Sequence, residues 1–184
     1  MAVSSPTTPL GTPLPPTTLP DVTGSEIDLA AHAGGRPLLV VFACNHCPYV
    51  RHLESALGAL LAEYGDHGLA VVAVAPNDVS THPDDDIPHL VEQADRAGWD
   101  FPYLVDTEQS AARAFGAVCT PDFFLYDAAH ELFYRGAFDS SSPGNQQPLT
   151  GGDLRAALDA VLAGAPAPQP QRPAMGCSIK WKGE

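Results

Sequence analysis

Apolar residues in the middle of the chain form two continuous runs separated by an amphipathic segment. Residues 38–43 and 69–75 consist of Val, Leu, Ala and Phe alone, a pattern typical of strands that are covered on both faces. Between them, residues 48–64 place Val, Leu and Tyr at the spacing of one helical face. Two buried strands joined through a helix predict a parallel pair with a right-handed crossover.

Shorter elements are predicted in the second half of the chain. The pattern indicates helices over residues 84–97, 108–115 and 153–163 and strands over residues 101–105, 122–126 and 131–136. The last two strands flank a turn at residues 127–130 and form an antiparallel hairpin. Together these elements predict an α/β sandwich with a mixed central sheet.

Prolines concentrate at the two ends of the chain, which are therefore expected to be extended, either lying on the body or loose in solvent. We expect a Pro/Thr-rich N-terminal extension over residues 1–18, a single domain over residues 19–163 and a C-terminal tail over residues 164–184. The tail holds Ile179, Trp181 and both lysines of the protein. This composition favours a strap that packs on an acidic body.

Composition narrows the function classes. The 184 residues include 9 Lys and Arg against 22 Asp and Glu, a formal net charge of −13. This negative charge repels nucleic-acid backbones and anionic lipids, so neither is an expected partner. The apolar runs are far shorter than a bilayer span, and the N-terminus lacks the basic and apolar regions of a secretory signal. We expect a cytoplasmic protein, in which four cysteines indicate metal or redox chemistry.

The strongest candidate for chemistry is the segment Cys44-Asn45-His46-Cys47-Pro48, between the first buried strand and the following helix. Two thiols separated by two residues close a disulfide with little backbone movement, and the positive helix N-terminus favours the attacking thiolate. We expect Cys44, at an exposed tip, to attack first and Cys47 to resolve the mixed disulfide. A cationic His46 would lower the pKa of Cys44. The disulfide itself would be the redox group, with no separate cofactor and no metal.

Two other interpretations of these cysteines stay open. They could be a structural pair, or part of a zinc site completed by Cys119 and Cys177 if the tail folds back. If the motif binds a metal ion, the protein would be a metal-binding chaperone that uses Cys44, Cys47 and His46.

A second group of polar residues, His82 and the aspartates at 84–86, has the composition of a metal site. We favour a simpler interpretation, in which the aspartates stabilise the positive N-terminus of the helix predicted at residues 84–97.

Four motifs taken together resemble the thioredoxin superfamily, in its branch related to AhpC/TSA and redoxin domains. They are Leu-Pro-Asp-Val-Thr-Gly (19–24), Cys-Asn-His-Cys (44–47), Phe-Pro-Tyr-Leu-Val-Asp (101–106) and Cys-Thr-Pro-Asp-Phe-Phe-Leu (119–125). The resemblance covers about residues 19–163, and residues 45–50 and 176–182 are also similar to a group of bacterial thioredoxin-family proteins. It implies a thioredoxin fold, with three α/β/α layers around a mixed sheet, and thiol–disulfide oxidoreductase activity in cell redox homeostasis.

By the same resemblance, Thr120-Pro121 corresponds to a cis-proline loop that faces the CxxC motif and binds substrate. In the family, the backbone of this loop pairs with the substrate chain like an added strand. The competing interpretation is a trans proline that begins the strand at residues 122–126. The implied partners are protein or small-molecule disulfides and a reducing partner, and we expect a monomer or weak dimer.

Two departures from the family patterns affect the expected mechanism. Thioredoxins carry a buried Asp six positions before the first Cys, where this chain has Leu38. Asp78, just past the second buried strand, is our candidate for the missing proton acceptor. The competing interpretation is that Asn77 and Asp78 only form a turn.

The second departure concerns the branch of the family. Peroxiredoxins carry a Thr three positions before the peroxidatic Cys, and aligning that motif on Cys47 puts Cys44 at the Thr position. A thiol in place of the hydroxyl that orients peroxide favours dithiol–disulfide exchange. A thioredoxin-dependent peroxidase, with Arg113 as its cation, is the alternative function.

Asn45, Cys119 and Cys177 are auxiliary candidates. Cys119 is expected near the CxxC motif, either as an electron relay or as a small apolar residue in a packed loop. Cys177 would form a second redox couple with Cys119 if the fold brings their Cα atoms within about 7 Å.

Overall fold

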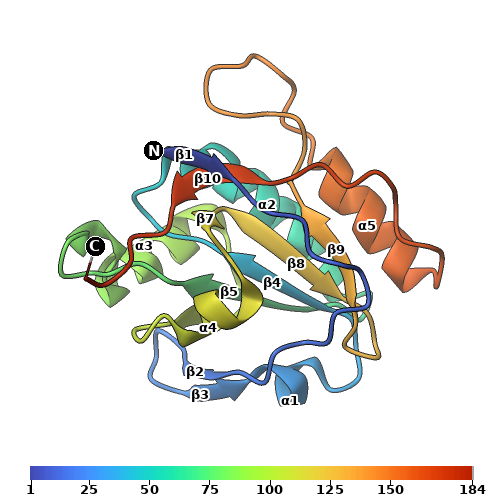
Figure 1. The fold of residues 1–184 in the computed structure, drawn as a ribbon, viewed down its shortest axis with the longest axis horizontal. Coiled ribbons are helices and arrows are strands. Elements are labelled where there is room, and N and C mark those ends of the chain that lie inside the picture. Colours follow the sequence, from blue (N-terminus) through green and yellow to red (C-terminus); the bar gives the residue numbers. More distant parts are fainter. Residues whose placement is uncertain (184) are drawn as a thin grey trace.

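The computed structural model of the protein describes residues 1–183 and contains a central five-stranded sheet (Figure 1). In sheet order, its strands are β6 (Tyr103–Val105), β5 (Ala70–Ala75), β4 (Leu38–Phe42), β8 (Asp122–Tyr126) and β9 (Leu132–Gly136). β4, β5 and β6 are parallel, whereas β8 and β9 run antiparallel to their neighbours. The predicted mixed central sheet is therefore confirmed.

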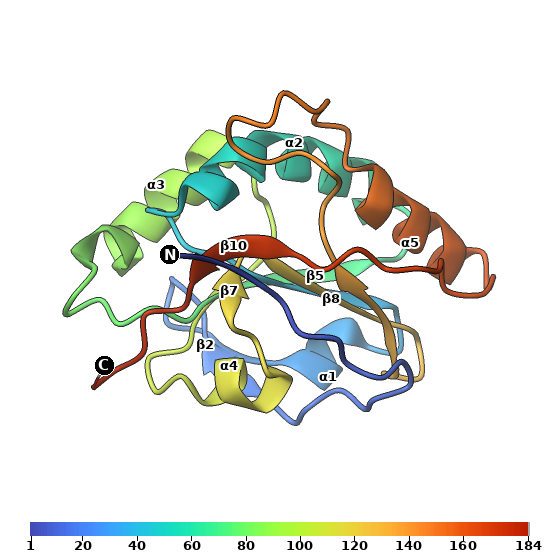
Figure 2. The ribbon, with the colours of Figure 1, turned by 45° about the horizontal axis from the view of Figure 1, so that its top comes forward.

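Helices cover both faces of this sheet and complete three layers (Figure 2). One face carries α2 (Pro48–Gly65), α3 (Ile87–Ala97) and α5 (Gly152–Leu162), and the other carries α1 (Leu29–Ala33) and α4 (Ser110–Phe115). Successive side chains of a strand point to opposite faces, so β4 contributes to both layers of the core. Leu39 packs in the cluster with α2, and Val40 packs in the cluster with α1 and α4.

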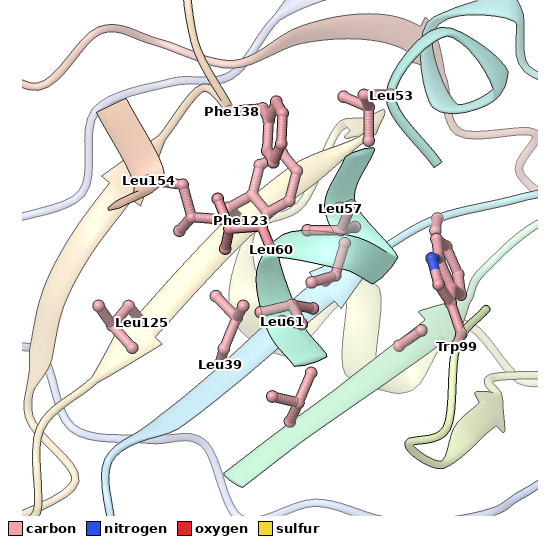
Figure 3. Close-up of a cluster of buried hydrophobic side chains, with 14 of the residues drawn as sticks. Leu39, Leu53, Leu57, Leu60, Leu61, Trp99, Phe123, Leu125, Phe138 and Leu154 are labelled. Atoms are coloured by element: carbon pink, nitrogen blue, oxygen red, sulfur yellow. The ribbon is translucent and has the colours of Figure 1, made fainter. Parts of the chain in front are cut away.

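The larger core cluster lies between the sheet and α2 (Figure 3). Leu57 and Leu61 project from α2 toward Leu39 of β4, and Phe123 and Leu125 extend the cluster along β8. All five side chains are nearly or fully buried, so this contact excludes water and holds α2 firmly against the sheet. The loop between β4 and α2, which contains the CxxC motif, is therefore anchored at both ends.

The aspartate-rich segment before α3 differs from the prediction of one helix over residues 84–97. The helix begins at Ile87, and Pro83–Asp85 forms a separate 3₁₀ turn, η1. Asp86 is the N-cap of α3, and its carboxylate accepts a hydrogen bond from the backbone N–H of His89. Because Asp86 alone fills the capping role, the neighbouring Asp85 is available for another contact.

Both ends of the chain contribute to one small antiparallel sheet beside the start of β8 (Figures 1 and 2). In this sheet β10 (Met175–Ser178) lies between β1 (Ala2–Ser4) and β7 (Cys119–Thr120). A separate hairpin, β2 (Thr18–Pro20) and β3 (Glu26–Asp28), precedes α1. Among residues 1–183, no helix combines the length and the apolar character needed to cross a membrane.

Candidate active site

The CxxC segment and the Thr120-Pro121 segment, far apart in sequence, meet at one end of the central sheet. Cys44 lies between β4 and α2, and Cys47 is the N-cap residue of α2. The Cys44 sulfur lies 3.2 Å from the Thr120 hydroxyl oxygen, and the Cys47 sulfur lies 3.1 Å from the Thr120 carbonyl oxygen. The Thr120–Pro121 peptide bond is cis, as the resemblance implied. The structure thus brings together the two segments that the sequence singled out.

The two thiols of the motif differ in how readily they ionise. Burial raises the pKa of Cys44 well above its ordinary value, and the neighbouring Cys47 and the Asp85 carboxylate raise it further. By contrast, hydrogen bonds to the Cys47 sulfur, first from the Cys44 thiol and then from Cys177, lower the pKa of Cys47 to about 5. The N-cap position of Cys47 adds the positive end of the α2 dipole. Of the two motif cysteines, Cys47 is therefore the one that ionises more readily.

The expectation that Cys44 stands at an exposed tip is wrong, because its side chain is 0% exposed. The CxxC loop is folded onto η1 and α3. The Asp85 carboxylate accepts hydrogen bonds from the backbone N–H groups of the two residues after Cys44. Gln93 Nε2 donates a hydrogen bond to the Cys44 carbonyl oxygen over 3.3 Å. Cys47 is also fully buried. The order of attack inferred from the sequence depended on the exposure of Cys44, and the environments of the two sulfurs favour the reverse order.

Asp85 is the central polar residue of the loop, and sequence reasoning did not assign it to the site. Its carboxylate accepts four hydrogen bonds: from the backbone N–H groups of Asn45 (2.8 Å) and His46 (3.0 Å), from His46 Nδ1 (2.6 Å) and from Asn77 Nδ2 (2.8 Å). Burial alone would raise the pKa of Asp85, but these hydrogen bonds lower it overall. Asp85 therefore stays ionised and fixes the conformation of the CxxC loop.

We expect the variant Asp85→Ala to lower the free energy of unfolding by about 2–4 kcal/mol. The substitution leaves buried N–H donors of the CxxC loop without an acceptor, and each such group costs about 1–3 kcal/mol. Chemical denaturation of the reduced protein measures the effect. Asp84→Ala is the matched control, since the Asp84 side chain is exposed, and it should change stability by less than about 0.5 kcal/mol. Equal stabilities of the two variants would contradict this role of Asp85.

His46 lies beside Cys44, as expected, but its ring is held by a partner that the sequence did not reveal. Its Nδ1 donates to Asp85, and the ring packs on His82 with 4.9 Å between centroids. Donor atoms of Cys44, His46 and Asp85 lie within 4.8 Å of one another, so the three form a set that could hold a metal ion. Cys47, which the sequence-based metal hypothesis included, is not in this set. Because the Asp85 carboxylate already accepts four hydrogen bonds, a metal would have to displace His46 from it.

A second buried network supports the loop from α2 and α3. Glu54, which is 6% exposed, accepts hydrogen bonds from the guanidinium group of Arg96 and from Gln93 Nε2. The Tyr103 hydroxyl donates to Gln93 Oε1, and Gln93 in turn donates to the Cys44 carbonyl oxygen. The sequence analysis did not single out Gln93 or Glu54, because charged and amide side chains in helices are ordinarily exposed.

The auxiliary candidates occupy different places. The Asn45 side chain bridges the Asp84 carbonyl oxygen and Arg96, so it helps to fix the loop. The Asp78 carboxylate accepts hydrogen bonds from the backbone N–H and the hydroxyl of Ser80. These bonds form the turn that was the alternative to a proton-acceptor role. Cys119 is fully buried, and burial raises its pKa, as for a packed core residue.

Cys177 takes a position that the sequence did not predict. It lies in β10 directly opposite Thr120. Burial and the neighbouring Cys47 sulfur raise the pKa of Cys177 to about 12. The tail therefore brings this cysteine to Cys47 of the CxxC motif.

Comparison with known proteins supports the relationship indicated by the motifs. The AhpC/TSA family model matches residues 10–135. A hypothetical protein from Sinorhizobium meliloti 1021 shares 43% sequence identity and a TM-score of 0.95, over 98% of this chain and 99% of that chain. An uncharacterized conserved protein from Geobacillus kaustophilus shares 41% identity and a TM-score of 0.96, over 100% of this chain and 98% of that chain.

More distant structures share the fold. A secreted disulfide oxidoreductase from Mycobacterium tuberculosis has a TM-score of 0.60 at 16% identity, over 78% of this chain and 95% of that chain. This likeness shows the fold alone, which is thioredoxin-like. The search of curated proteins found no match.

Proposed function

Because the chain belongs to the AhpC/TSA family and has a thioredoxin-like fold, we propose that it is a thiol–disulfide oxidoreductase that works through Cys44 and Cys47. The observation that carries the proposal is the pair of sulfurs beside Thr120, of which burial raises the pKa of Cys44 while the hydrogen bond from Cys44 lowers the pKa of Cys47. A merely structural pair has no need for this difference in ionisation.

The proposed reaction begins at Cys47. Its thiolate attacks one sulfur of a substrate disulfide, so that a Cys47–substrate disulfide forms and the other substrate sulfur leaves with the electron pair. The proton held by Cys44 passes to the leaving sulfur, and Cys44 then attacks Cys47. This second exchange releases the reduced substrate and leaves a Cys44–Cys47 disulfide. A dithiol of a reducing partner returns the protein to its starting state by the reverse steps.

The proposed substrate surface is the backbone edge at Thr120 and the hollow next to Pro121. This hollow has a volume of about 320 Å³, and its lining includes Tyr49, His52, Phe138 and Ser141. Aromatic and hydroxyl groups in one lining suit an extended peptide segment. Protein disulfides are therefore our favoured substrates, with small-molecule disulfides as the alternative.

Peroxidase activity is the second candidate function, and the thiolate at Cys47 favours it. That residue aligns with the peroxidatic position, although Cys44 still stands where the peroxide-orienting hydroxyl is expected. Consumption of hydrogen peroxide that is lost in Cys47→Ser but kept in Cys44→Ser would identify a peroxidase. Peroxide consumption no faster than that of free cysteine would leave disulfide exchange as the function.

Trapping of mixed disulfides tests the proposed function. The variants are made in a Cys177→Ser background, so that no third thiol lies beside Cys47. There, Cys44→Ser leaves no thiol to resolve the Cys47–substrate disulfide, and we expect stable adducts with a disulfide-bonded peptide and with oxidised glutathione. The matched variant Cys47→Ser should give at least tenfold less adduct, because the remaining Cys44 has a raised pKa. Intact-mass spectrometry counts the adducts. If Cys47→Ser traps more than Cys44→Ser, then Cys44 is the attacking residue; if neither traps, the exchange mechanism fails.

The cytoplasm is our proposed location, supported by the small number of cysteines and their proposed reactivity. One protein of similar fold is secreted, so the location needs its own test. Fractionation of cells that express the protein, followed by detection in each fraction, should find it with cytoplasmic markers.

A further inference from the structure

Residues 174–183, here called the C-terminal strap, cover the edge at which a substrate chain would pair. In the strap, β10 runs antiparallel to β7, with Cys177 opposite Thr120 and Ser178 opposite Cys119 (Figures 1 and 2). On its other side β10 pairs with β1, where Cys177 faces Ala2. The strap therefore occupies the strand position that the proposed function assigns to an extended peptide substrate.

A close backbone approach at Gly176 seats the strap on the Thr120–Pro121 peptide. A Cβ atom at residue 176 would lie 2.0 Å from the Thr120 carbonyl oxygen and 2.9 Å from Pro121 N. Both of these are backbone atoms of a buried segment, so they have little room to move. Glycine is therefore the residue that permits this approach, and any side chain at 176 would push the strap outward.

Contacts beyond β10 hold the strap on the acidic body. Ile179 is 2% exposed in the second core cluster, and Trp181 lies under the guanidinium group of Arg113, 4.4 Å from the ring centroid. The backbone carbonyl oxygen of Lys180 accepts a hydrogen bond from Gln109 Nε2, and its backbone N–H donates one to Asn77 Oδ1. Asn77 also donates to Asp85, which links the strap to the residue that shapes the CxxC loop.

The register of β10 delivers a third sulfur to the site. Thr120 contacts both sulfurs of the motif, and Cys177 is the residue directly across from Thr120. The Cys177 side chain packs against the core cluster that contains both motif cysteines, yet it stays partly exposed. We infer that Cys177 is a third redox residue of this site, which exchanges with the Cys44–Cys47 disulfide to form a Cys47–Cys177 disulfide. This inference rests on the proposed function.

The exchange needs no further oxidant or reductant. The Cys177 thiolate attacks the Cys47 sulfur of the Cys44–Cys47 disulfide, the Cys47–Cys177 bond forms, and Cys44 leaves with the electron pair. Cys44 takes up the proton that Cys177 has lost, so one disulfide and one thiol are present before and after. In the product the strap is covalently tied over the substrate edge. The strap is thus an internal substrate that competes with external disulfides and closes the oxidised site.

The variant Cys44→Ser isolates the predicted bond. After oxidation of the full-length reduced variant with diamide, which accepts the two electrons and two protons, we expect a Cys47–Cys177 disulfide in most molecules. Peptide mapping after alkylation identifies it. Adding Cys177→Ser should abolish the crosslink, whereas adding Cys119→Ser should leave it in place. A Cys47–Cys119 bond, a disulfide between two chains or fully alkylated Cys177 would each overturn the inference.

The variant Gly176→Ala tests the role of the strap without removing a sulfur. We expect the Cys47–Cys177 crosslink, measured in the Cys44→Ser background, to form at least tenfold more slowly. Alkylation of Cys47 by iodoacetamide in the reduced protein should become at least tenfold faster. Met175→Ala, at an exposed neighbouring residue, is the matched control and should leave both rates unchanged. Unchanged rates in Gly176→Ala with unchanged circular dichroism would overturn the strap's role.

The variant Cys177→Ser separates this inference from the proposed function. In one outcome, Cys177→Ser forms a Cys44–Cys47 disulfide and exchanges with oxidised glutathione, but Cys44→Ser forms no Cys47–Cys177 bond. Cys177 is then not a third redox residue, and the proposed function stands. If Cys177→Ser forms no Cys44–Cys47 disulfide, the exchange has no starting disulfide and both are overturned. A Cys44–Cys47 disulfide in Cys177→Ser together with the Cys47–Cys177 bond in Cys44→Ser supports both.

Discussion

Replacing Arg135 by leucine is expected to lower the free energy of unfolding by about 3–5 kcal/mol. The guanidinium group is 3% exposed and lies 2.9 Å from the carboxylate of Asp122, which is fully buried. Burial raises the pKa of Asp122 to about 6 even with Arg135 beside it, so the carboxylate depends strongly on this partner. Removing one member of such a pair leaves an uncompensated buried charge. Urea or guanidinium denaturation at pH 7 measures the loss.

Two controls separate the buried pair from the general loss of an arginine. Arg172→Leu removes the partner of Asp153 at an exposed site, and it should cost less than about 1 kcal/mol. The double variant Asp122→Leu with Arg135→Met replaces both charges by apolar groups, and it should recover most of the stability. A change below 1 kcal/mol in Arg135→Leu would contradict the importance of the pair.

Titration of the reduced protein is expected to show one thiolate that forms near pH 5. The hydrogen bond from Cys44 is the main reason that the pKa of Cys47 is low, and Cys177 contributes a second one. At pH 7 the thiolate fraction should be about 99%, against about 3% for a free cysteine with a pKa near 8.5. Thiolate absorbance at 240 nm measures it without requiring access of a reagent to the buried sulfur.

The variants assign that thiolate. The step near pH 5 should vanish in Cys47→Ser and persist in Cys119→Ser. In Cys44→Ala it should move to higher pH, because alanine removes the donor of the strongest hydrogen bond to the Cys47 sulfur. A first thiolate that forms only near pH 8–9, or one that survives in Cys47→Ser, would contradict the assignment.

The parts of the fold that were predicted are those with a strong local pattern. β4 and β5 are continuous apolar runs, and α2 has a full helical face that ends near Gly65, so burial and local sequence agree. β7 and β10 have two and four residues, and they become strands through their partners in the fold. No pattern of their own distinguishes them from loop.

In the candidate site, too, some features could be predicted from the local sequence and others depend on the fold. The spacing of Cys44 and Cys47 and the Thr120-Pro121 pair were visible in the sequence, and they lie together. Asp85 was not assigned, because nothing in a run of three aspartates shows which one faces the loop. One signal was available: a helix has one N-cap, so the run holds more carboxylates than capping requires. The roles of the two sulfurs depend on burial and on Cys177, which only the fold reveals.

The equilibrium between the dithiol and the disulfide forms of Cys44 and Cys47 tests the account most directly. The full-length protein is equilibrated in glutathione buffers of different ratios, alkylated, and mapped by mass spectrometry. A reversible Cys44–Cys47 disulfide should form with a midpoint nearer to about −200 mV than to the value of about −270 mV typical of thioredoxin, because the Cys47 thiolate stabilises the reduced form. The absence of a Cys44–Cys47 disulfide at every ratio, or a midpoint at or below that of thioredoxin, would contradict it.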